Sequence, residues 1–205
     1  MRRLAERHPS DRIVAFSDGV VAIAITVLLL PLADLDTKDG QVLDLLSANS
    51  QLLWGLTLTW VIIAVFWFAH HRMFDRIVEV DRVVLWLNFG WLFAIALLPL
   101  PTNIVVQNEP SAQVTGFYIG WMALISLLMT AIVWYSHRTP GLMDDDVVGS
   151  DAARMGRIRA SLISVVFVFA FLVALVVPAI ATYVLLLMFF VDLLTARIAR
   201  RLTAR

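Results

Sequence analysis

Apolar segments long enough to cross a lipid bilayer recur along the whole chain. The hydrocarbon layer of a membrane is about 30 Å thick, and a helix crosses it in about 20 apolar residues. Segments of this kind, separated by polar residues, predict transmembrane helices. There are six of them: Ile13–Ala33, Leu52–Phe74, Val83–Val106, Val114–Tyr135, Ile158–Val177 and Ala179–Ile198.

The overall composition supports an all-α polytopic membrane protein. The chain is 60% hydrophobic and only 16% charged, against about 45–50% and about 25% in soluble domains. One soluble core cannot bury this excess. The absence of cysteine excludes disulfides, thiol catalysis and cysteine-ligated metals or haem. The net charge of zero gives no reason to expect a nucleic-acid partner.

Three of these segments have an alternative interpretation. One continuous helix over Ile158–Ile198 would be about 60 Å long, twice the hydrocarbon thickness. Pro178 lies at its middle, so two helices joined by a tight turn are expected. The segment Ile13–Ala33 follows several arginines, as the apolar part of a signal peptide does. It carries Asp18 and lacks an A-x-A-like cleavage site, so we expect a mature helix.

The basic residues are partitioned between the two sides of the predicted membrane. With six helices, Lys38 alone falls on one side. A five-helix topology would break this partition, because it moves the C-terminal arginines across. The positive-inside rule then predicts cytoplasmic N- and C-termini. The cytoplasmic side receives Arg2, Arg3, Arg7, Arg12, Arg72, Arg76, Arg82, Arg138, Arg154, Arg157, Arg159, Arg197, Arg200, Arg201 and Arg205.

Nothing in the sequence predicts an enzyme, a cofactor or a metal site. The longest connection, Ser136–Arg157, is too short for a folded domain, and its consecutive acids Asp144–Asp146 do not converge on one ion. His70 and His71 are adjacent, so on a helix they diverge by about 100°, whereas metal-binding pairs prefer i,i+4 spacing. No nucleotide loop, hydrolase elbow or glycosidase pair is present.

Asp18 is the clearest charged residue inside a predicted span, and Asn88 and Asp192 are the other notable polar residues. A charge at the bilayer centre costs at least about 2.5–3.5 kcal/mol. Two interpretations stay open. The carboxylate either fixes packing by bonding to Arg12, a histidine or a tryptophan N–H of a neighbouring helix, or it has a direct ionic role.

The first predicted helix carries an apolar face that suits a pore. Ile23, Thr26 or Val27, and Leu30 recur at i, i+3 or i+4, and i+7, so they share one side of the helix. Such a face either packs, meets lipid or lines a narrow conduit that dewets. Periodicity alone favours packing or lipid. The small residues that flank this face are Gly19, Ala22 and Ala24.

The start of this helix resembles a known family. The run Arg12 to Gly19 contains Phe16, Ser17 and Asp18. It is similar to the R-x-x-x-F-S-D signature of the prokaryotic homologues of the lysosomal potassium channel transmembrane protein 175. Two further runs, Trp67–Phe74 and Leu87–Thr102, resemble the second and third helices of that family.

The resemblance implies a subunit of six helices, four copies of which surround a central pore lined by the first helix. Residues 1–205 then form a single transmembrane channel domain. The T-V-G-Y-G filter of ordinary potassium channels is absent from the sequence. By resemblance, the pore is constricted by apolar and threonine levels at Ile23, Thr26, Val27 and Leu30.

The same resemblance assigns a structural or gating network at the cytoplasmic side of the pore helix. Its members hold neighbouring helices together and do not bind the ion. They are Arg12, Phe16, Ser17, Asp18, Trp67, His70, His71 and Asn88.

The function that the resemblance implies is therefore a homotetrameric, potassium-permeable channel of the bacterial plasma (inner) membrane that conducts passively. Its partners are potassium ions, further copies of the chain and the lipid bilayer. One alternative is a proton- or cation-coupled secondary transporter, in which Asp18 and the histidines relay protons, although paired broken helices with midplane charges are missing. The other alternative is a membrane scaffold that conducts nothing.

Overall fold

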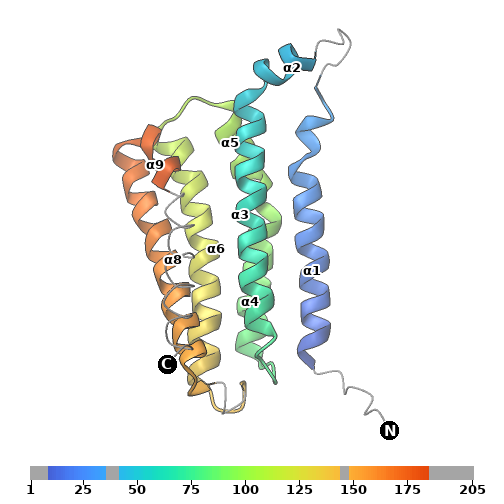
Figure 1. The fold of residues 1–205 in the computed structure, drawn as a ribbon, viewed down its shortest axis with the longest axis vertical. Helices are drawn as coiled ribbons and strands as arrows, with labels where there is room; N and C mark the ends of the chain where they lie inside the picture. Colours follow the sequence, from blue (N-terminus) through green and yellow to red (C-terminus); the bar gives the residue numbers. More distant parts are fainter. Residues whose placement is uncertain (1–8, 36–41, 144–147, 185–205) are drawn as a thin grey trace, which may run out of the picture.

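The computed structural model describes residues 9–35, 42–143 and 148–184. Long helices lie side by side and run nearly parallel, with α1 at one edge and α8 toward the other (Figure 1). The long elements are α1 (Pro9–Leu28), α3 (Ser50–Phe74), α4 (Arg82–Leu97), α6 (Ala112–Arg138) and α8 (Asp151–Val176). The shorter ones are η1 (Leu30–Leu32), α2 (Val42–Ala48), α5 (Pro99–Gln107) and α9 (Pro178–Val184).

Five helical segments of the described residues are long and apolar enough to cross a membrane. The prediction of an all-α polytopic membrane protein is confirmed. Each of the first five predicted segments overlaps one of these spans. The sixth, Ala179–Ile198, lies largely outside the described residues, and α9 covers its start. The spans are Ser10–Leu32, Ser50–Phe74, Arg82–Gln107, Ala112–Arg138 and Asp151–Val176.

The spans differ from the prediction most clearly in two places. Helix α8 begins at Asp151 and not at Ile158, because the Ser150 side chain caps it by accepting from the Ala153 N–H at 3.2 Å. Hydropathy marks where a helix enters lipid, not where it starts. The third span is broken at Leu98, between α4 and α5. Pro99 has no N–H to continue the helix, so α5 starts afresh there.

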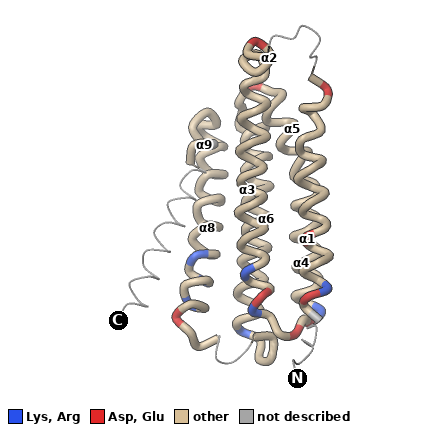
Figure 2. Tube along the Cα trace, turned by 45° about the vertical axis from the view of Figure 1, so that its right-hand side comes forward, with Lys and Arg blue, Asp and Glu red and all other residues tan. Residues whose placement is uncertain are grey.

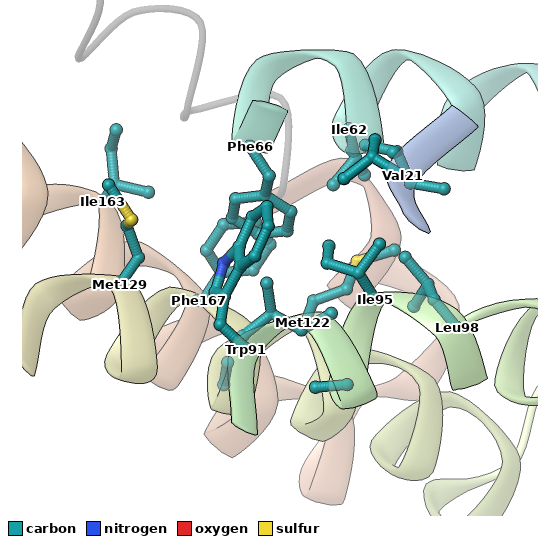
Figure 3. Close-up of a cluster of buried hydrophobic side chains, with 14 of the residues drawn as sticks. Val21, Ile62, Phe66, Trp91, Ile95, Leu98, Met122, Met129, Ile163 and Phe167 are labelled. Atoms are coloured by element: carbon teal, nitrogen blue, oxygen red, sulfur yellow. The ribbon is translucent and has the colours of Figure 1, made fainter. Parts of the chain in front are cut away.

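The centre of the bundle is packed by large side chains from α3, α4, α6 and α8. Phe66, Trp91 and Phe167 meet there, and the Phe66 and Phe167 rings are 5.4 Å apart (Figure 3). Lipid is as apolar as these side chains, so close van der Waals packing and polar contacts must hold the helices together.

Buried hydroxyl groups supply polar contacts between helices. The Thr59 hydroxyl lies 2.8 Å from the Tyr118 hydroxyl and links α3 to α6. Ser164 of α8 lies 2.8 Å from both Ser126 and Thr130 of α6. Such contacts contribute about 0.6 kcal/mol each in membranes, with larger values in some cases.

The loops that follow α3 and α6, at the arginine-bearing end of the bundle, are hydrogen-bonded to each other. The Val78 N–H donates to the Leu142 carbonyl at 2.9 Å. Asp81 caps α4 by accepting from the Val84 N–H at 2.8 Å, and the Tyr135 hydroxyl of α6 donates to its other oxygen at 2.6 Å. Partial burial acts to raise the pKa of the Asp81 carboxyl, but these hydrogen bonds hold the pKa below its ordinary value.

Two glycines, Gly120 of α6 and Gly90 of α4, allow a test of how tightly α6 packs against α8. A Cβ atom at Gly120 would lie 3.0 Å from the Phe171 ring, whereas one at Gly90 would lie 3.8 Å from Leu128. Both substitutions to alanine improve helix propensity equally. We expect Gly120→Ala to be less stable than Gly90→Ala by about 1–3 kcal/mol, because only the first overpacks an interface. Thermal unfolding of the two purified variants measures this difference, and equal stability would contradict it.

Candidate functional site

Helix α1 has one buried face, which packs on α3 and α4. Val21 and Ala24 are 3% exposed and Leu28 is 1% exposed. Their spacing of three and four residues places them on one side of the helix, in line with buried Ser17. This narrow, small-residue face is the main apolar contact of α1 with the described part of the chain.

The four residues predicted to constrict a pore lie on the opposite, exposed side of the first span, Ile23, Thr26 and Val27 in α1 and Leu30 at the start of η1. Ile23 is 65% exposed, Leu30 60% and Val27 42%. Thr26 is exposed as well, and its hydroxyl donates to the Ile23 carbonyl at 2.8 Å. Packing against the described part of the subunit is therefore excluded for these residues. Lipid, another subunit or a conduit are then the candidates for their surroundings.

Small residues continue this exposed face toward the start of α1. Gly19 and Ala22 are exposed, and a Cβ atom at Gly19 would meet nothing within 4 Å. Ala24, the third small residue of the sequence prediction, lies on the buried face instead. Small side chains let helices approach closely in lipid. The face from Gly19 to Leu30 is called the open face of α1 below.

Asp18 is tied to a neighbouring helix by a tryptophan. The Trp67 Nε1–H of α3 donates to Asp18 Oδ1 at 2.7 Å, and both side chains are partly buried. A tryptophan N–H was one of the three partners that the sequence predicted. Another, Arg12, is exposed and forms no ion pair with any residue the structure describes.

Ser17 is tied to two helices at once through Asn88. The Asn88 amide donates to Ser17 Oγ at 3.1 Å, and its oxygen lies 2.8 Å from His70 Nε2. Because that amide oxygen only accepts, His70 Nε2 carries the proton. All three side chains are buried. This chain of hydrogen bonds links α1, α4 and α3.

The two adjacent histidines have different surroundings. His70 is stacked between Phe74, at 4.3 Å, and Trp91, at 4.5 Å. His71 instead lies 3.9 Å from the Asp75 carboxylate, near the surface. The sequence predicted no stacking partners for His70. No group of three histidine, cysteine or acidic residues in the described ranges is placed to hold a metal ion.

Phe16 completes the set of predicted network residues. Its ring meets the Phe89 ring of α4 edge to face, at 6.0 Å. The structure thus brings Phe16, Ser17 and Asp18 against α3 and α4, while Arg12 stays outside this group. The arrangement can fix the position and rotation of α1, and it contains no nucleophile and base pair that would carry out catalysis.

Comparison with known proteins finds similarity to potassium channels. Residues 12–99 match the family described as endosomal/lysosomal potassium channel TMEM175. A potassium channel of Streptomyces collinus is 33% identical over 163 residues, covering 76% of this chain and 77% of that protein. A potassium channel of Chamaesiphon minutus is 33% identical over 134 residues, covering 62% of this chain and 66% of that protein.

A solved structure and a vertebrate relative extend the comparison. The crystal structure of a lysosomal potassium-selective channel TMEM175 homolog from Chamaesiphon minutus has a TM-score of 0.75, with 91% of this chain and 97% of that chain covered. At 20% identity it shows the fold alone. The endosomal/lysosomal proton channel TMEM175 of Danio rerio is 25% identical over 144 residues. The match covers 69% of this chain but only 28% of that protein.

Asn88 is the residue whose loss should most weaken the attachment of α1. Asn88→Ala removes both hydrogen bonds and leaves two buried partners unsatisfied, so we expect a loss of about 1–3 kcal/mol in stability. Ser17→Ala is the matched control, because it breaks only the bond to α1. Thermal unfolding of both variants and of the double variant measures the coupling. Strictly additive losses would mean that Ser17 and Asn88 do not interact.

Proposed function

Because the chain belongs to the TMEM175 family of potassium channels, we propose that it conducts potassium passively along a path lined by α1. The observation that carries this proposal is the open face of α1, which holds Ile23, Thr26, Val27 and Leu30 away from the other described helices of the subunit. The protein is a member of a channel family and not an enzyme.

The pore is formed by four copies of the chain around a central axis. The open face lies on an outer helix of the bundle, so the described part of one subunit does not enclose it (Figure 1). Several copies must turn this face inward to close a path. Four is the number implied by the family resemblance, with residues 1–205 as one channel domain of six helices in each copy.

Ile23 forms the main constriction. It lies five residues after Asp18, which is about 7.5 Å along the helix. A ring of isoleucine side chains excludes water and offers no carbonyl oxygen to replace it. An ion must give up hydration there, and potassium does so more easily than sodium, whose smaller radius holds water more strongly. Selectivity then arises from width and hydrophobicity.

Thr26 provides a polar level next to this constriction. Its hydroxyl proton is directed to the Ile23 carbonyl, so the oxygen lone pairs are what it offers to the path. Lone pairs attract cations and not anions. Val27 and Leu30 continue the apolar lining beyond it.

The network of Ser17, Asp18, Trp67, His70 and Asn88 positions the pore helix. Its hydrogen bonds fix how α1 is rotated against α3 and α4. Arg12, Phe16 and His71 belong to the same end of the site. In this proposal they set the conducting state and do not bind potassium.

The orientation in the membrane follows from the arginines, and the proposed location is a bacterial inner membrane. In the described ranges the basic residues gather toward one end of the bundle (Figure 2). Under the positive-inside rule this end is cytoplasmic, and so are both termini of a six-helix chain.

Protons are the second candidate ion. The vertebrate relatives that match this chain are named proton channels. A hydrophobic constriction without ordered oxygen ligands sets no strong barrier against protons when it is wetted. The flux experiment below therefore reads potassium and proton movement in the same vesicles.

Replacement of the constriction tests the function. In liposomes holding purified protein, we expect a potassium flux that follows the imposed voltage and needs no counter-ion gradient. Ile23→Asn supplies oxygen and wetting at the narrowest point, so conductance should rise severalfold and sodium should pass almost as well as potassium.

Val165→Asn is the control, since Val165 is equally exposed on α8 (62%) but lies away from the proposed path. It should keep the parent's conductance. Unchanged conductance and ion preference in Ile23→Asn would remove the open face of α1 from the pore. A flux that requires a counter-ion gradient would indicate a transporter. The absence of any flux would indicate a scaffold.

Cysteine labelling tests the orientation. The chain has no cysteine of its own, so single replacements report cleanly. Glu109→Cys should react with an impermeant thiol reagent in intact cells, and Arg76→Cys should react only after the cells are broken. The reverse pattern at either position would overturn the proposed topology.

A further inference from the structure

Helix α4 carries exposed aromatic side chains directly beside the pore helix. Trp86 is 73% exposed, Phe93 64% and Phe89 43%. Their spacing of three and four residues places them on one side of α4, and they are called the aromatic row below. The Phe89 ring contacts the Trp86 ring at 6.2 Å and the Phe16 ring of α1 at 6.0 Å. The aromatic row therefore adjoins the side of α1 that is nearest to α4.

The side of α1 that is nearest to α3 carries small residues instead. Asp18 marks this side, because it accepts the hydrogen bond from Trp67 of α3. Ala15 lies three residues before Asp18 and Ala22 four residues after it, so both are on the same side of the helix. Both alanines are exposed. Large rings thus project on one flank of the pore helix, and only methyl groups are presented on the other flank.

The rings and the alanines also lie at matching depths in the bundle. Helices α1 and α4 run in the same direction, and the hydrogen bond of α1 to Asn88 joins residues that are 71 positions apart. Both helices rise by about 1.5 Å per residue, so each residue of α1 lies near the depth of the residue 71 positions later. Ala15 is then level with Trp86, and Ala22 is level with Phe93.

A ring of copies brings these two flanks together. Rotation about an axis along the membrane normal leaves the depth of every residue unchanged. Contacts in a ring are head-to-tail, so the α4 flank of one copy meets the α3 flank of the next. Trp86 and Phe93 of one copy then face Ala15 and Ala22 of the neighbouring copy. Close approach of large to small side chains is how helices associate in lipid. Contact with lipid tails alone would require neither the shared spacing nor the shared depth.

We propose that the aromatic row of each copy docks on the pore helix of the next copy, at Ala15 and Ala22. This inference rests on the proposed function, because the open face of α1 encloses a path only when copies meet on both of its flanks. The pore helix already packs on α3 and α4 of its own copy. The neighbouring α4 adds a third support, and the partner of this surface is a second copy of the chain.

Disulfide crosslinking tests the contact, because the chain has no cysteine of its own. One tagged copy carries Phe93→Cys and a differently tagged copy carries Ala22→Cys. The two full-length chains are co-expressed, and their membranes are treated with a mild oxidant. A disulfide requires that the two Cα atoms approach to about 4.4–6.8 Å. We expect a mixed dimer that carries both tags.

Two sets of controls separate this contact from random collisions. Each single variant is first expressed alone, and neither should dimerise, because in a head-to-tail ring neither position meets its own equivalent. Val165→Cys is then paired with Ala22→Cys. Val165 of α8 matches Phe93 in exposure, 62% against 64%, but lies away from the aromatic row. This pair should give no mixed dimer.

An exchange of sizes tests the fit without a disulfide. Ala22→Phe places a ring where the Phe93 ring of the neighbouring copy should lie, so we expect the tetramer fraction in native mass spectrometry to fall severalfold. Ala22 is exposed within its own copy, so the fold of the subunit should be retained. Adding Phe93→Ala to the same chain removes the clash and should restore the tetramer.

The results that would overturn the interface differ from those that would overturn the proposed function. Equal crosslinking of Phe93→Cys and Val165→Cys to Ala22→Cys, or none with either, would mean that the aromatic row faces lipid. Dimers of Phe93→Cys with itself would indicate a two-fold contact and not a ring. A tetramer that Phe93→Ala does not restore would remove the pairing. Mixed dimers without any potassium flux would support the interface and overturn the channel function.

Discussion

The hydrogen bonds of Ser17 and Asp18 to α4 and α3 are the constraint on which the site depends. In lipid there is little hydrophobic drive between helices, and the buried apolar face of α1 is narrow. A rotation of α1 by one residue, about 100°, would take both side chains away from their partners. In one of its two directions the same rotation would turn Ile23 toward the neighbouring helices, so the two bonds help to determine which residues α1 leaves open.

This attachment is not uniform along α1. The polar contacts lie near residue 18, whereas Leu30 is about 18 Å further along the helix. There α1 gives way to the 3₁₀ turn η1, which contains Pro31 and no buried residue. The rotation of α1 is therefore fixed most firmly at the arginine-bearing end. At the other end, Leu28 is the one buried residue in the last turn of α1.

Hydropathy and the F-S-D run predicted much of this arrangement, but not all of it. Segment length was enough to find five spans, because lipid imposes it. The stacking of His70 between Phe74 and Trp91 was not predictable, since it depends on how α3 and α4 are set against each other. The open face of α1 was undecided for the same reason: both sides of the helix are apolar in sequence, and only its neighbours distinguish them.

Polar groups are treated in two ways in the described part of the molecule. Some are paired between helices, as Thr59 is with Tyr118 and Ser164 with Ser126. Others, such as Trp91 Nε1 and His70 Nδ1, are buried without a hydrogen-bond partner among the described residues. The hydroxyl pairs therefore add to the close packing that holds the bundle together, and they do not replace it.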